Sequence, residues 1–105
     1  MPCWGDMELS LEGVIRGSLI TIHSTDRQDR DHFVVQRLLP HGSEPLSGFR
    51  YYTLLCVGLV KEGAREEILV NFSYFSIEDL EELEAFGHQI DIIPGVVVVL
   101  PEHLV

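Results

Sequence analysis

The chain has 105 residues, of which 46% are hydrophobic, and its 17 acidic residues against seven Lys or Arg give a formal net charge of -10 at pH 7. This length predicts one domain with one modest core. All seven basic residues precede Glu66, whereas nine carboxylates follow from Glu66 onward. Such a negative field argues against binding to nucleic acid or to an anionic membrane, and favours a basic protein surface as partner.

The first third of the chain predicts strands. Residues 1–6 show no pattern and are expected to be an unstructured extension, so that residues 7–105 form the single domain. Residues 8–15 alternate between apolar and polar side chains, as a half-buried strand does. The apolar phase shifts after Gly17 and Ser18, which predicts a turn into a second strand from Leu19. Residues 24–31 hold no apolar residue and predict a loop before a strand at residues 32–39.

The middle of the chain predicts a β-hairpin. Residues 40–48 contain two Pro and two Gly and predict a second loop. Residues 49–60 are apolar on both faces from Leu54 onward, which is typical of a central strand that is covered on both sides. A polar turn around Gly63 separates this strand from the alternating residues 67–75, and the two strands are expected to pair.

A single helix is predicted over residues 76–86. Ser76 and Asp79 have the spacing of a capping box, and Gly87 supplies a left-handed stop. Apolar residues recur every third position, so the stripe drifts by about 60° per step and the helix must lie obliquely on its support. The residues expected to form this buried stripe are Ile77, Leu80, Leu83 and Phe86.

Two short strands are expected at the end of the chain, at residues 88–93 and 96–100, separated by Pro94 and Gly95. The sum is an α+β fold: a mostly antiparallel sheet of five or six strands, open or half-barrel, with one acidic helix packed on it. One helix cannot cover both faces of so apolar a sheet, so we expect a homodimer in which a second copy supplies the missing layer. A half-barrel that covers itself is the monomeric alternative.

The acidic helix is the first candidate site. Its carboxylates include like-charge neighbours three and four positions apart, with no basic residue nearby in sequence. The functional interpretation is a face that binds a basic partner, and the structural alternative is a solvated helix face that aids solubility. The residues of this predicted partner-binding face are Glu78, Glu81, Glu82 and Glu84.

A row of aromatic residues on the paired strands is the second candidate. Such residues can line a concave sheet face that holds a small apolar ligand, although aromatic residues on paired strands more often serve core or cross-strand packing. The predicted ligand-binding residues are Tyr51, Tyr52, Phe72 and Tyr74.

Catalysis, metals and cofactors have no motif in this sequence. The five histidines are scattered, and no Cys-x-x-Cys or His-x-x-x-His spacing occurs, so we expect no metal site and no cofactor. Cys56 lies in an apolar run and is expected to be a buried, unreactive thiol. With two cysteines, no apparent signal peptide and no apolar run near the ~20 residues that span a bilayer, the expected location is the cytoplasm.

Two hypotheses of function remain. The first is a non-catalytic protein-binding or regulatory module, similar to an inhibitor or antidote, whose acidic C-terminal face covers a basic site on another protein. Small acidic domains of this kind are plausible cargo of mobile elements, by analogy of size and charge alone. The second is a small-molecule-binding α+β domain that uses the aromatic sheet face, with or without weak catalysis.

Overall fold

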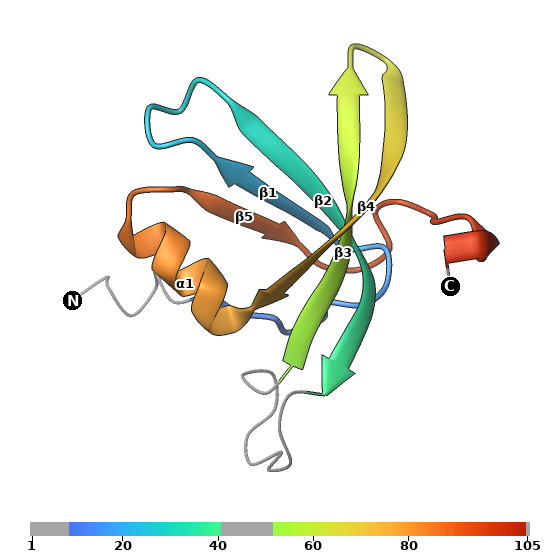
Figure 1. Cartoon of the computed structure of the whole chain (residues 1–105), viewed down its shortest axis with the longest axis horizontal. Coiled ribbons are helices and arrows are strands. Elements are labelled where there is room, and N and C mark those ends of the chain that lie inside the picture. The colour runs from blue at the N-terminus through green and yellow to red at the C-terminus, as the bar shows by residue number, and fades with distance from the viewer. Residues whose placement is uncertain (1–8, 41–51, 105) are drawn as a thin grey trace.

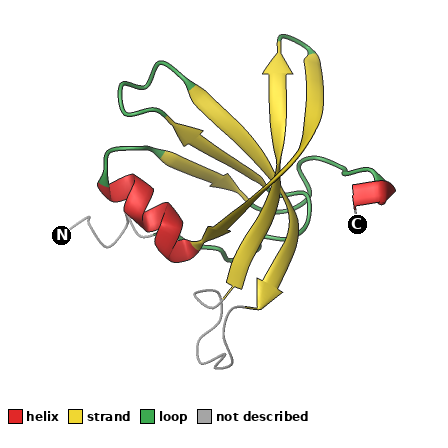
Figure 2. Ribbon diagram, in the orientation of Figure 1, coloured by secondary structure: helices red, strands yellow, loops and turns green. Residues whose placement is uncertain are grey.

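The computed structural model describes residues 9–40 and 52–104 and confirms the α+β fold (Figure 1). Within these ranges, five strands form one antiparallel sheet in the order β4-β3-β2-β1-β5, and one α-helix packs on it (Figure 2). The elements are β1 (Leu19–His23), β2 (Arg30–Pro40), β3 (Tyr52–Glu62), β4 (Arg65–Ser76), α1 (Ile77–Ala85), β5 (Ile90–Ile93) and the short 3-10 helix η3 (Glu102–Leu104).

The predicted hairpin between β3 and β4 is confirmed. Its pairing closes at Glu62 and Arg65, with Gly63 in the left-handed region at φ 61°. The register shifts further along, because the pairs Cys56–Ser73 and Gly58–Leu69 are two residues apart on β3 and four apart on β4. This bulge bends β4, which is an edge strand of the sheet.

The first core lies between the sheet and α1. Period-two alternation sends one set of strand side chains to this face, and the helix closes over them with Ile77 and Leu80. The segment before β1 adds Leu11 and Val14 to the same layer. The other buried members are Ile20, Val35, Leu54, Cys56 and Ile90.

The opposite face of the sheet has its own core. Leu100 and Leu104 of the C-terminal segment cover it, and the sheet contributes Leu19, Val34, Val57 and Leu59. A bulge in β2 between Val35 and Arg37 contains Gln36, whose buried amide nitrogen donates a hydrogen bond to the carbonyl of Leu104. The chain therefore supplies the second cover that sequence reasoning assigned to a second copy.

The predicted strand at residues 8–15 is wrong over the part that the structure describes. Residues 9–18 make turns, in which Gly13 and Gly17 adopt φ values of 81° and 99°. The hydroxyl of Ser18 accepts a hydrogen bond from the amide of Ile15 and so stabilises the second turn. Left-handed glycines reverse the chain where uniform alternation predicts an extended one.

The predicted strand at residues 96–100 is also wrong. The amides of Val97 and Val98 both donate to the carbonyl of Gly17, at 2.9 and 3.0 Å, and the hydroxyl of Ser18 donates to the carbonyl of Gly95. In a β-ladder successive amides bond to different carbonyls, whereas here two neighbouring amides share one carbonyl, as at a bend. This segment therefore crosses the turns before β1 without joining the sheet. A Cβ on Gly17 would lie 2.8 Å from the carbonyl oxygen of Val98, so the crossing requires glycine.

Candidate functional site

Helix α1 is fixed to the end of β4 by a capping box. The Ser76 hydroxyl accepts from the amide of Asp79 at 3.1 Å, and a carboxylate oxygen of Asp79 accepts from the amide of Ser76 at 3.0 Å. Strand and helix therefore meet at one residue, and this orients the outer face of α1 rigidly relative to the sheet.

The outer face of α1 is acidic and ends on an aromatic side chain. Glu78 and Glu82 are exposed, whereas Glu81 and Glu84 are half-buried at the sides of the helix. Phe86, the C-cap residue, is 72% exposed. The prediction that Phe86 belongs to the buried stripe is wrong, because three steps of about 60° carry it to the side of the helix opposite Ile77. We call Glu78, Glu82 and Phe86 the α1 stripe, since they follow one another at intervals of four residues.

The predicted aromatic face is only partly described. Tyr51 lies outside the described residues, and Tyr52 is the first residue of β3, with its side chain outside the described part. Phe72 and Tyr74 lie on β4 and are 49% and 58% exposed. These two side chains therefore face solvent on an edge strand of the sheet.

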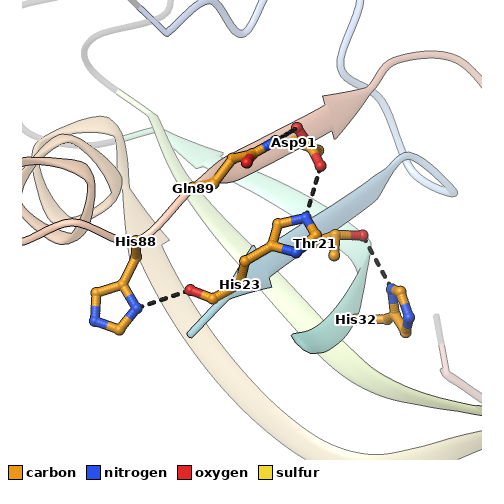
Figure 3. A network of polar contacts seen from close by, with 6 residues as sticks. All are labelled: Thr21, His23, His32, His88, Gln89 and Asp91. Atoms are coloured by element: carbon orange, nitrogen blue, oxygen red, sulfur yellow. Dashed lines mark hydrogen bonds and ion pairs between the residues drawn. The ribbon is translucent and has the colours of Figure 1, made fainter. Parts of the chain in front are cut away.

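A polar network that the sequence did not reveal connects β1 with β5 and the residues just before it (Figure 3). Ile20, Ile22 and Ile90 point to the core under α1, so the alternating side chains of His23 and Asp91 lie on the opposite face of the sheet. Nε2 of His23 on β1 lies 2.8 Å from a carboxylate oxygen of Asp91 on β5. Since a carboxylate only accepts, the imidazole donates this hydrogen bond. The Gln89 amide donates to the other oxygen of Asp91 at 3.2 Å, and His88 bonds through Nδ1 to the carbonyl of His23 at 2.9 Å.

Hydrogen bonding sets the ionisation of Asp91. The bond from His23 is the largest effect and lowers the pKa of Asp91 below 3.8, and the bond from Gln89 lowers this pKa further. Partial burial of Asp91 raises its pKa, but by less than the hydrogen bonds lower it. Asp91 is therefore ionised at neutral pH and holds β5 to β1 through its charge.

A second histidine lies on the next strand of the same face. Nδ1 of His32 is 3.0 Å from the hydroxyl of Thr21, which is buried. Burial lowers the pKa of His32, and the positive charges of Lys61 and Arg30 lower it further. His32 is therefore a neutral imidazole at pH 7, held by Thr21 in a positive field.

Sequence spacing gave no signal for this network, because His23 and Asp91 are 68 residues apart. The pairing of β1 with β5 brings them together: Thr21 is the cross-strand partner of Asp91. No set of three or more His, Cys, Asp or Glu side chains in the described ranges is arranged to hold a metal ion. Over the same ranges, α1 and the other helical segments are too short or too polar to cross a membrane.

Comparisons with known proteins identify no relative: the chain matches no protein-family model, no curated protein and no solved structure.

Proposed function

We propose that this protein is a non-catalytic binding or regulatory module, similar to an inhibitor or antidote, which covers a basic site on another protein with the α1 stripe. The observation that supports this most strongly is Phe86, an aromatic ring that is 72% exposed at the end of an acidic helix. Aromatic side chains anchor protein interfaces, because they bury a large area with few rotatable bonds.

The charges around Phe86 define the partner. Glu82 lies one helical turn before the ring, and Glu78 lies one turn before Glu82. The last turn of α1 has no basic residue, and no Lys or Arg occurs after Arg65. A row of carboxylates on a helix that contains no Lys or Arg attracts a basic surface, accelerates association and repels nucleic acid.

We further propose that the protein associates with itself through exposed aliphatic residues. Ile15, Ile93, Val96, Val97 and Val99 form what we call the aliphatic patch, and each is between 43% and 83% exposed. The amides of Val97 and Val98 donate hydrogen bonds to the carbonyl of Gly17. These bonds hold Ile15, in the turns before β1, close to the valines of the C-terminal segment. No charged residue occurs in residues 92–101, so two copies of a chain with a net charge of -10 can meet there with little like-charge repulsion.

A photo-crosslinking experiment tests the binding function. Benzoylphenylalanine replaces Phe86 in one variant and Tyr74, which is also exposed, in a control variant. We expect a discrete protein adduct at position 86 but not at position 74, formed in cells of the source organism and identified by mass spectrometry. The crosslinked peptide should lie on a surface rich in Lys and Arg.

Charge reversal then tests the role of the carboxylates. Glu78→Lys with Glu82→Lys, or reversal of Glu81, Glu82 and Glu84, should abolish the adduct at position 86, and added salt should weaken it. An adduct that forms equally at position 74, or that persists after charge reversal, would show that the α1 stripe is not the binding surface.

A further inference from the structure

The sheet contains a fork between β2 and β3. The two strands pair as far as His32 and Leu59. Beyond this pair, residues 30–31 of β2 remain paired with β1, whereas residues 60–61 of β3 remain paired with β4. Figure 1 shows the β3–β4 hairpin rising away from β1 and β2 at this point. The facing backbone edges of the two strands therefore no longer bond to each other, and the sheet opens.

A groove of about 460 Å³ occupies this fork. Its volume lies within the range of roughly 300–1,000 Å³ that is usual for small-molecule sites. Phe33 and Leu69 contribute apolar surface, and Leu59, which is almost fully buried, borders the groove from below. Gly58 has no side chain to fill the space, and a Cβ there would lie 3.5 Å from the Cβ of Leu69.

Side chains that donate hydrogen bonds surround this apolar surface. Arg30 and His32 come from β2, Lys61 from β3 and Asn71 from the bulged part of β4. Nδ1 of His32 is bonded to Thr21, which leaves Nε2 for a ligand. These groups come from three strands and meet only in the folded chain.

Charge favours an anion in this groove. Lys61 and Arg30 both lower the pKa of His32, so their positive field reaches the imidazole, and the same field stabilises a negative ligand. Asp31 also borders the groove and opposes this field in part. Nζ of Lys61 lies 3.6 Å from a carboxylate oxygen of Glu66, and both side chains are at least 40% exposed, so this ion pair is weak and Lys61 can turn to a ligand.

We propose that the fork between β2 and β3 binds a small organic anion, whose carboxylate or phosphate lies between Arg30 and Lys61 and whose apolar part lies against Phe33 and Leu69. The proposal does not depend on the α1 stripe, none of whose residues lines the groove.

Amide and imidazole NMR spectra provide the test, with benzoate, phenyl phosphate and benzyl alcohol as probes at constant ionic strength. We expect saturable shifts at residues 30–33, 58–61 and 69–71 with benzoate or phenyl phosphate. The neutral alcohol should bind at least about tenfold more weakly, since it lacks the charge. The pKa of His32 should rise when the groove is occupied. The stronger of the two anions identifies the ligand as a carboxylate or a phosphate.

Charge removal gives the matched control. Arg30→Gln with Lys61→Gln should weaken binding by about tenfold or more, whereas Arg37→Gln, an exposed site at the other end of β2, should leave it unchanged. All three side chains are on the surface, and unfolding curves would establish that each variant folds. Shifts spread over the whole protein, equal effects of the two substitutions, or no saturation at anion concentrations on the order of tens of millimolar would overturn the proposal.

Discussion

His23 donates a hydrogen bond of 2.8 Å to Asp91, although 68 residues separate the two. The pair connects β1 to β5, the short strand at one edge of the sheet. The imidazole is 17% and the carboxylate 48% exposed, so water screens the interaction only in part. The contact fixes β5 in place after α1 and so contributes to the position of the helix.

Replacing Asp91 by Asn should lower the free energy of unfolding by ~0.2–1 kcal/mol at neutral pH, the range of partly exposed charge interactions. The folded pKa of Asp91 is lowered, so the unfolded state binds more protons between this pKa and 3.8. The wild-type protein should therefore lose this contribution as the pH falls through that window. Urea unfolding near neutral pH and at about pH 3 measures it. Asp29→Asn, at an exposed loop position, is the control, and an equal effect of both variants would contradict the prediction.

Replacing Ser76 by Ala should lower the free energy of unfolding by ~0.5–2 kcal/mol, because the amide of Asp79 loses its acceptor at the N-terminus of α1. Ser10→Ala, an exposed serine in the turns before β1, should have a smaller effect. A urea midpoint that does not move with Ser76→Ala would count against a stabilising role for the capping box.

Cys56 should be unreactive in the folded protein. It is fully buried, and burial raises the pKa of its thiol to about 12. At about pH 8 only about one molecule in ten thousand is then a thiolate, the form that attacks alkylating reagents. Iodoacetamide should label Cys3 in the native protein but Cys56 only after unfolding. Cys3 lies outside the described residues. Rapid native labelling of Cys56 in a Cys3→Ser variant would reopen a role for this thiol in chemistry.

Acidification should destabilise the fold through His32. Its folded pKa lies below 6.5, so the unfolded state binds more protons between the two values, and stability is lost as the pH falls from 6.5 towards the folded pKa. Unfolding midpoints at about pH 7.5 and about pH 5.5 should differ less in His32→Gln than in the wild type. His103→Gln, at an exposed position of η3, should retain the wild-type difference.

The aliphatic patch should make the protein a homodimer. Sedimentation equilibrium at micromolar concentration should give about twice the chain mass of 11.9 kDa. Val96→Ser with Val99→Ser should shift this mass towards the monomer, because the two substitutions remove apolar surface from the patch. Both side chains are more than 60% exposed and belong to neither core, so the fold of each copy should remain. A wild-type mass of 11.9 kDa, independent of concentration, would show that the patch does not join two copies.

The sequence alone determined the elements whose signals are local. Ser76 and Asp79 are three residues apart, so the capping box and the start of α1 could be predicted from adjacent positions. The β3–β4 hairpin followed from an apolar run and an alternating run on either side of the polar turn around Gly63, and the burial of Cys56 followed from its apolar neighbours. Each of these depends on interactions along a short stretch of chain.

Tertiary structure decided the rest. Alternation in residues 8–15 indicated a strand, but Gly13 and Gly17 turn the chain so that residues 96–100 can cross it. The exposure of Phe86 depends on where α1 rests on the sheet. Arg30, His32 and Lys61 line one groove because β2 and β3 diverge, and the antiparallel register of β1 and β5 brings His23 to Asp91. Contacts between distant segments are set by how strands and turns pack in three dimensions, and a pattern read along one stretch of sequence carries no information about them.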